Sequence, residues 1–316
     1  MGNASSPQEY FDGSHILIPH SPFPAVLTVA FQGIPGAFSE EAVRHVFDAP
    51  DVMACDTFEA VFAAVETGSA DRAVVPIENA VFGSVHVNYD HLRAHDVTIV
   101  DEVHLRIRHH LLAPSGASLD TLRAVHSHPQ ALGQCRTSLQ TLAPQAATVS
   151  AYDTAGAARD VAERGKASEA AIASHRAADR YGLTVLAAGI EDNDQNYTRF
   201  LVLATAGTGA PSRPGARKTS IVFALRENVP GALFKSLAVF ALRELDLLKI
   251  ESRPLVGHPG RYVFYLDIDG SVRDDALNRA LDHLREISTE VQVLGSYPAG
   301  PMVDANGTQA GGAGGA

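Results

Sequence analysis

Short apolar runs alternate with longer mixed segments over residues 26–204. Runs such as VLTVAF (26–31) and RAVVPI (72–77) are typical of buried strands. The segments SEEAVRHVF (39–47) and DTAGAARDVAERG (153–165) predict helices, because each begins with a capping residue type and the second ends on glycine. Repetition of this strand–helix order predicts an α/β fold with largely parallel strands.

Residues 218–298 have a different pattern of apolar and polar positions. Four strand-like runs and two helix-like segments succeed one another in the order βαββαβ, which is the ferredoxin-like arrangement. The second of these helices is amphipathic, since residues 277, 281, 284 and 287 are apolar. A body of about 80 residues with this order is expected to bind a ligand or a second copy rather than to catalyse.

Breaks in the pattern suggest where the domains begin and end. Residues 1–25 contain four prolines and no periodicity, so they are expected to form an N-terminal extension. Residues 205–217 are rich in Gly and Pro and predict a linker between a catalytic region at 26–204 and a regulatory domain at 218–298. Residues 299–316 are expected to be a flexible tail. A chain ending near Ala206 is expected to keep some activity.

Composition excludes several classes of protein. With 25 basic and 36 acidic residues the net charge is −11, which disfavours nucleic acid and anionic membrane as partners. No apolar run approaches the roughly 18 residues of a transmembrane helix, and the N-terminus lacks the pattern of a secretory signal. Cys55 and Cys135 are expected to be buried thiols in a reducing compartment. We therefore expect a cytoplasmic protein.

The segment DNDQNYTRF (192–200) concentrates carboxylates, amides, a hydroxyl and an arginine directly before the apolar run FLVLA. Functional side chains tend to lie where a loop meets a rigid strand. Small and polar residues also occupy several predicted strand-to-helix turns, at 33–39, 78–84, 127–134 and 153–154. In α/β folds such turns converge at one sheet edge, where helix N-termini bind anions. The pattern predicts a site for a small anion.

Motifs for common cofactors are missing. The sequence has no GxxxxGK[ST] phosphate loop, no GxGxxG after the first strand and no GxSxG elbow. The pairs His126 with His128 and His109 with His110 lack a third ligand at a persuasive spacing, so no metal is predicted. Chemistry at the site is expected to use acids, amides, hydroxyls and N–H groups without a cofactor.

Several segments together resemble the prephenate dehydratases. The matching pieces, in the order found in that family, are GIPGAFSEEA (33–42), VVPIENAVFGSVHVNYD (74–90), SHPQALGQC (127–135), DTAGAA (153–158) and NYTRF (196–200). The second body is similar to the ACT regulatory domain, with PGALF (230–234) and ESRP (251–254) as effector motifs. One departure is Ala80, where the family often has Ser after PIEN.

The resemblance implies a two-lobed catalytic region, like a periplasmic binding protein, that converts prephenate to phenylpyruvate without a cofactor. It implies that Thr198 donates to the departing hydroxyl, with Glu78 and Asn79 orienting it. The implied substrate-binding residues are Ser39, Gly36, Ser84, Gln134, Asn196, Arg199 and Phe200. The implied phenylalanine-binding residues are Gly231, Ala232, Leu233, Glu251, Ser252, Arg253 and Pro254. For Arg199 a structural salt bridge and for Phe200 a core position are the competing interpretations.

Other interpretations stay open at the level of sequence. The segment GSVHVNYD is also similar to the plant arogenate dehydratases, so arogenate is an alternative substrate. A non-catalytic amino-acid sensor and a periplasmic solute-binding protein are further alternatives. ACT domains of this kind commonly pair, so we expect a homodimer or homotetramer that responds to phenylalanine.

Overall fold

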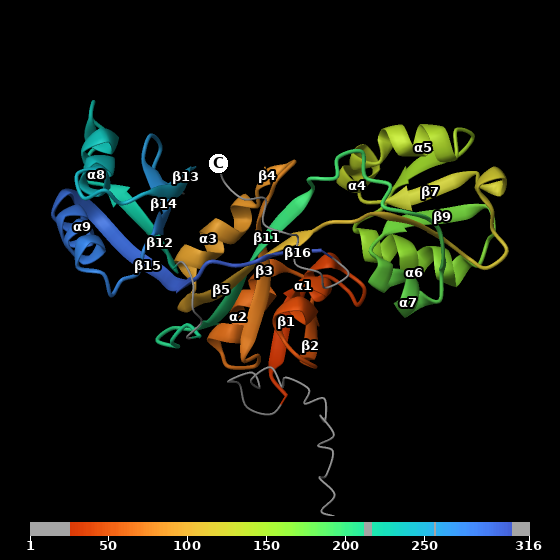
Figure 1. The fold of residues 1–316 in the computed structure, drawn as a ribbon, viewed down its shortest axis with the longest axis horizontal. Helices are drawn as coiled ribbons and strands as arrows, with labels where there is room; N and C mark the ends of the chain where they lie inside the picture. The colour runs from red at the N-terminus through yellow and green to blue at the C-terminus, as the bar shows by residue number, and fades with distance from the viewer. Residues whose placement is uncertain (1–25, 212–216, 256, 305–316) are drawn as a thin grey trace, which may run out of the picture.

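The computed structural model describes residues 26–211, 217–255 and 257–304, which form three sheets in a row (Figure 1). The expected N-terminal extension, residues 212–216 of the expected linker and residues 305–316 of the expected tail lie outside these residues. Among the described residues, no helix is long and apolar enough to cross a membrane.

The first lobe surrounds a seven-stranded sheet in the order β16-β5-β11-β3-β1-β2, with β4 paired to β3. Its strands are β1 (Thr28–Gln32), β2 (Asp51–Cys55), β3 (Arg72–Asn79), β4 (Gly83–Ser84), β5 (Val97–Arg106), β11 (Tyr197–Thr205) and β16 (Met302–Val303). Its helices are α1 (Phe38–Val46), α2 (Phe58–Glu66) and α3 (His86–Ala94).

The second lobe is inserted between β5 and β11 and has a five-stranded sheet in the order β10-β6-β9-β7-β8. Its strands are β6 (His110–Ala113), β7 (Ala124–Ser127), β8 (Ala147–Ser150), β9 (Glu169–Ala173) and β10 (Thr184–Ala188). Its helices are α4 (Pro129–Gln134), α5 (Arg136–Leu142), α6 (Thr154–Arg164) and α7 (His175–Tyr181), with a short 3₁₀ turn at Leu119–Thr121.

Two chain segments, 107–109 and 189–196, join the lobes, so the expected two-lobed α/β arrangement is confirmed. The strands are not all parallel. Strand β11 runs antiparallel to both β3 and β5, because the chain re-enters the first lobe from the second.

The C-terminal domain confirms the βαββαβ order. It consists of β12 (Arg217–Leu225), α8 (Ala232–Ala241), β13 (Leu247–Pro254), β14 (Tyr262–Asp269), α9 (Asp275–Ile287) and β15 (Ser288–Pro298). The antiparallel sheet has the order β13-β14-β12-β15. Helices α8 and α9 cover one face with an apolar core that includes Phe223, Phe240 and Leu281.

The other face of this sheet packs on the first lobe. Val222, Ala224 and Val263 belong to the same buried cluster as Ile77 and Leu201 of the first lobe. The two bodies therefore share one core, which a chain ending near Ala206 would expose to water. That such a chain keeps some activity stays a prediction.

The expectation of a flexible tail from residue 299 is wrong for residues 299–304. After β15 the chain returns to the first lobe, where β16 pairs in parallel with β5. The backbone N–H of Gly300 donates to Glu102, and the backbone N–H of His104 donates to the carbonyl of Pro301. These contacts fix the segment that follows the C-terminal domain.

Candidate active site

A cleft of about 580 Å³ lies between the two lobes and is lined by residues of both. Of the residues expected to act on substrate, the lining includes Ser39, Asn79, Ser84, Gln134, Thr198 and Phe200. The strand-to-helix turns of both lobes border it, as the sequence pattern predicts, since Phe38 begins α1 and Thr154 begins α6.

Alternation along β11 and β3 decides which polar residues face the cleft. Thr198 pairs with Asn79 and Arg199 pairs with Glu78 in the register of the two strands. Successive side chains of a strand point to opposite faces of the sheet. Thr198 and Arg199 therefore point to opposite faces, and so do Asn79 and Glu78. Thr198 and Asn79 line the cleft, whereas Arg199 and Glu78 face the C-terminal domain.

The amide of Asn79 is held in one orientation. Its oxygen accepts from the backbone N–H groups of Val81 and Phe82 at 2.9 and 3.0 Å. Its nitrogen must then face Thr198, to whose hydroxyl oxygen it donates at 2.9 Å. Since that oxygen is engaged as an acceptor, the Thr198 hydroxyl keeps its own hydrogen for a group in the cleft. Thr198 is 8% exposed, so little water competes for it.

A chain of amides extends from Asn79 to the second lobe. Asn79 also donates to the side chain of Asn196 at 2.8 Å, and Asn196 donates to Gln134 at 3.2 Å. The same oxygen of Gln134 lies 2.5 Å from Nε2 of His109. The expected residues Asn196 and Gln134, of which Gln134 lines the cleft, thus connect the lobes and fix Asn79.

His109 was missed by the motif analysis as a cleft residue. It lines the cleft, and its ring meets that of Phe38 edge-on at 5.4 Å. Burial lowers the pKa of His109, so the ring is neutral, and its Nδ1 atom has no hydrogen-bond partner in the part of the chain described. His128, Phe82 and Tyr152 also line the cleft, and only their position in the fold reveals them.

Among the described residues, no Lys or Arg side chain lines the cleft to bind anions. The lining does include Ser39 in the first turn of α1. The first N–H groups of a helix lack intrahelical partners and carry a partial positive charge. Together with the hydroxyls, these groups are suited to bind carboxylates, as expected from the sequence.

The structure places two expected site residues, Glu78 and Arg199, away from the cleft. Glu78 lies 2.8 Å from Lys249 of the C-terminal domain and does not line the cleft. Arg199 is buried between Glu102 and Asp267, at 2.7 and 2.5 Å, and also donates to Tyr297. The physical reason is the strand alternation, which turns both side chains away from Thr198.

Gly36 is corrected as well. Its N–H donates to Glu40 at 2.7 Å, so it is not available to a ligand, and its carbonyl accepts from Ser174 of the second lobe. A Cβ at this position would approach the backbone of Ala177 at 3.0 Å. Gly36 with φ +94° therefore permits close contact between the lobes.

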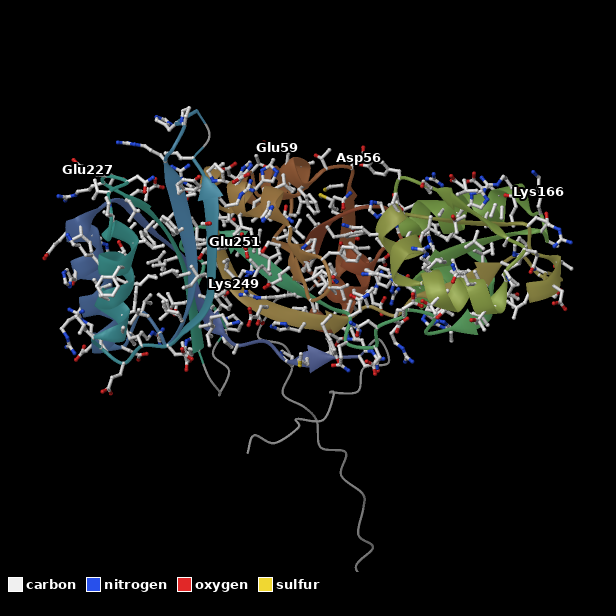
Figure 2. The ribbon with its side chains drawn as sticks, turned by 90° about the horizontal axis from the view of Figure 1, so that it is seen from above. Asp56, Glu59, Lys166, Glu227, Lys249 and Glu251 are labelled. Atoms are coloured by element: carbon white, nitrogen blue, oxygen red, sulfur yellow. The ribbon has the colours of Figure 1, made fainter. Side chains whose placement is uncertain are left out.

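Ser84 connects the cleft to the C-terminal domain. It lines the cleft on the short β3–β4 hairpin, yet its hydroxyl donates to Glu251 at 2.5 Å. Figure 2 shows Glu251 and Lys249 together where the C-terminal sheet meets the first lobe. Strand β13 thus contacts both strands of the hairpin, through Glu251 at Ser84 and through Lys249 at Glu78.

The expected effector residues fall into two groups. Gly231 takes φ +82° before α8, and Ala232 and Leu233 form its first turn. In ESRP, Glu251 and Arg253 face the first lobe, since Arg253 pairs with Asp90 at 2.5 Å. Ser252 and Pro254 alternate with them and are exposed. Within one chain, these contacts therefore direct Glu251 and Arg253 toward the catalytic region.

These features define a class of protein. It has two α/β lobes, a cleft with a fixed hydroxyl, and a docked ferredoxin-like domain. The family model for prephenate dehydratase matches residues 29–208. The chain therefore belongs to the prephenate dehydratase family, and the resemblance of its motifs is confirmed.

Individual relatives agree with this assignment. The chain is 48% identical over 282 residues to arogenate dehydratase/prephenate dehydratase 2, chloroplastic, of Arabidopsis thaliana, covering 85% of this chain and 72% of that protein. The structure of prephenate dehydratase in complex with L-Phe from Arthrobacter aurescens is 35% identical, with a TM-score of 0.81 and coverage of 90% and 92%. A structure described as GqqA, a novel type of quorum quenching acylase, is also 35% identical, with a TM-score of 0.80 and coverage of 87% and 98%.

The expected cytoplasmic location is contradicted by these comparisons. The Arabidopsis relatives with 48% and 47% identity are both chloroplastic proteins. Charge, cysteine content and the absence of an apolar N-terminal run are compatible with more than one aqueous compartment, so composition was too weak a basis for that expectation.

Proposed function

We propose that this protein catalyses the decarboxylating dehydration of prephenate to phenylpyruvate. The observation that carries the proposal is the Thr198 hydroxyl, which Asn79 holds as a donor toward the cleft. Membership of the prephenate dehydratase family supports the same reaction.

The reaction needs little from the protein beyond orientation. The bond from the ring to its carboxylate breaks and releases CO₂, the electron pair moves through the ring, and the C–O bond to the 4-hydroxyl breaks. The leaving oxygen takes up a proton and departs as water, while the ring becomes aromatic. Thr198 is a weak acid, so its role is an oriented hydrogen bond that strengthens as charge develops on the leaving oxygen.

The side-chain carboxylate of the substrate would bind at the first turn of α1, where Ser39 adds a hydroxyl. Aromatic neighbours such as Phe38 and Phe200 would face the ring. His109, neutral and with Nδ1 unpartnered among the described groups, would accept a hydrogen bond from the substrate.

Arogenate is the second candidate substrate. The Arabidopsis relative with 48% identity is named for both activities. Parallel assays of purified full-length protein with prephenate and with arogenate test the proposal directly. Turnover of arogenate alone would replace prephenate with arogenate, and turnover of neither would leave the non-catalytic amino-acid sensor.

The first mutational prediction concerns Thr198. We expect Thr198→Ala to lower kcat by about 10²–10³, the range for loss of one positioned donor in the transition state, with a much smaller change in KM. Thr198→Ser keeps the hydroxyl and is expected to stay within about tenfold of wild type. A Thr198→Ala protein that folds normally and retains kcat would refute the assignment.

We further propose that phenylalanine regulates the enzyme through the C-terminal domain of a homo-oligomer. Exposed apolar side chains gather on α8, at its C-terminal cap and on the edge strand β13, namely Phe234, Leu242, Leu248 and Ile250. An apolar helix face beside an unpaired sheet edge is suited to pair with a second copy. Gly231 at the start of α8 would let an amino-acid carboxylate approach the backbone N–H groups.

The effector prediction uses calorimetry. Phenylalanine is expected to bind the wild type, and Gly231→Val is expected to abolish binding because position 231 requires φ +82°. Glu251→Gln is expected to preserve activity without phenylalanine and to weaken its effect, because Glu251 contacts Ser84 beside the cleft. Equal binding to wild type and Gly231→Val would remove this site.

A further inference from the structure

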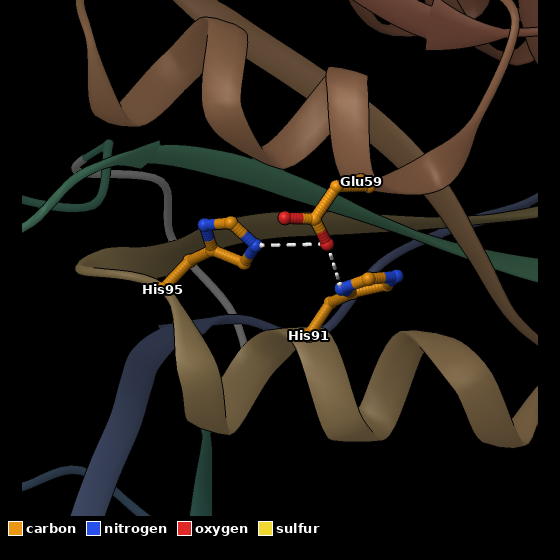
Figure 3. Close-up of side chains that lie close together, drawn as sticks. All are labelled: Glu59, His91 and His95. Atoms are coloured by element: carbon orange, nitrogen blue, oxygen red, sulfur yellow. Dashed lines mark ion pairs between the residues drawn. The ribbon is translucent and has the colours of Figure 1, made fainter.

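Helices α2 and α3 bring two imidazoles and a carboxylate together on the side of the first lobe (Figure 3). His91 and His95 lie four residues apart on α3, so they share one face of the helix. Glu59 in the first turn of α2 points between them. The three ligand atoms lie within 4.8 Å of one another. Among the described residues, no other group of three or more His, Cys, Asp or Glu side chains brings its ligand atoms this close together.

The distances match those around a tetrahedral ion. Oε2 of Glu59 lies 3.1 Å from Nδ1 of His91 and 3.5 Å from Nε2 of His95. Bonds of about 2.0–2.1 Å at tetrahedral angles separate two ligands by about 3.4 Å. The two distances from Glu59 bracket this value, and the two ring nitrogens lie within 4.8 Å of each other, so an ion would fit with small side-chain movements.

A second carboxylate orients the site. Nδ1 of His95 lies 2.9 Å from Glu66, whose other oxygen accepts from the backbone N–H of Asp96. A proton held on Nδ1 leaves Nε2 as the lone-pair donor toward Glu59 and His91. Such a carboxylate behind the imidazole is the usual outer partner of a metal-bound histidine.

The two imidazoles are also fixed by packing. The ring of Phe62, which is fully buried, lies 5.1 Å from His91 and 5.5 Å from His95 between ring centroids. Glu59 is 64% exposed at its side chain, so water reaches the position opposite the two rings. The arrangement supplies three protein ligands and leaves a fourth position for solvent.

We propose that Glu59, His91 and His95 form a binding site for a divalent transition metal ion of the Zn²⁺ type. Two imidazoles and a carboxylate are ligands that suit this class, whereas Mg²⁺ and Ca²⁺ prefer oxygen ligands alone. The site is separate from the cleft, and its residues are not among those that line it.

The ion would connect the cleft to the C-terminal domain. Phe58, next to Glu59 on α2, lines the cleft. On α3, Asp90 and Arg93 pair with Arg253 and Glu290 of the C-terminal domain. A metal that joins α2 to α3 would therefore stiffen the connection between the catalytic wall and the domain proposed to bind the effector.

The test is calorimetric titration of ZnCl₂ into tag-free, chelator-treated full-length protein, repeated with Co²⁺ as a spectroscopic probe. One ion per chain is expected, with Co²⁺ absorbing as a tetrahedral complex. At metal tenfold above Kd the melting temperature should rise by about 2–3 °C. Absence of binding would overturn the proposal.

Variants locate the site. Glu59→Gln changes an exposed side chain without disturbing the fold and should weaken binding at least tenfold, as should His91→Ala. Glu66→Gln should weaken it by about 10–100-fold through His95. His126→Ala is the matched control, because His126 lies 3.4 Å from the carboxylate of Glu169 in the second lobe. Unchanged affinity in Glu59→Gln and His91→Ala, or a loss in His126→Ala equal to theirs, would place the metal elsewhere.

Discussion

At the scale of single residues, position within a strand separates chemistry from structure. Thr198 and Arg199 are neighbours in sequence, yet one lines the cleft and the other lies in a buried ion network with Glu102. Burial alone would raise the pKa of Glu102, but His104 and the charges of Arg199 and Lys218 hold it well below its usual range. Arg199 therefore belongs to the domain interface, while Thr198 faces the cleft.

Glu41 supports a prediction about pH. Burial raises its pKa to about 7, although Arg176 opposes the shift. In the unfolded chain its pKa is near 4.5, so the folded protein binds more protons between about pH 4.5 and 7, and stability falls as pH rises through that window. We expect Glu41→Gln to stabilise the protein by about 1–3 kcal/mol at pH 8 and to change little at pH 4.5.

Urea unfolding of wild type and Glu41→Gln at the two pH values checks this prediction. Glu163→Gln is the control, because Glu163 is 70% exposed and should show no such dependence. Equal stability of wild type and Glu41→Gln at pH 8 would show that ionisation of Glu41 does not lower the free energy of unfolding.

At the scale of elements, β11 joins the catalytic cleft to the C-terminal sheet. We expect Arg199→Met to destabilise the protein by about 3–5 kcal/mol, because Glu102 and Asp267 would lose a buried counter-charge. Arg159→Met removes an exposed pair with Asp160 and should cost less than about 1 kcal/mol. Urea unfolding compares the two, and similar losses would mean that the Arg199 network contributes no more than a surface pair.

The elements were predicted well because their signals are local. The βαββαβ order and the helix at 153–165 follow from periodicity and caps. The local sequence does not predict the face of the sheet to which Arg199 and Glu78 point. Alternation predicts that adjacent side chains point to opposite faces, but not which of the two faces the cleft. One signal was readable: Ile221, Val222 and Phe223 are consecutively apolar, which is typical of a sheet buried on both faces. The Gly/Pro-rich residues 205–217 instead suggested a linker between two separate bodies.

At the scale of the whole molecule, the catalytic and C-terminal units share one core. Strand β15 passes so close to β5 that position 295 has room only for glycine, because a Cβ there would overlap the carbonyl oxygen of Ile99. Tyr265 of the C-terminal sheet donates to the backbone of Tyr89 on α3. Docking of the C-terminal domain is therefore part of the fold, and the two units are in direct contact.

Gly295→Ala tests this shared core. We expect it to destabilise the protein by about 1–3 kcal/mol or more, because the methyl group would push β15 away from the backbone of β5. Gly133→Ala in α4 is the matched control, because a Cβ there meets nothing within 4 Å, and it should be neutral or stabilising by up to about 1 kcal/mol. Hydrogen exchange should show that protection falls together in β5 of the first lobe and β14 of the C-terminal domain. If protection falls in β14 while β5 is unchanged, the two units unfold separately and the core does not couple them.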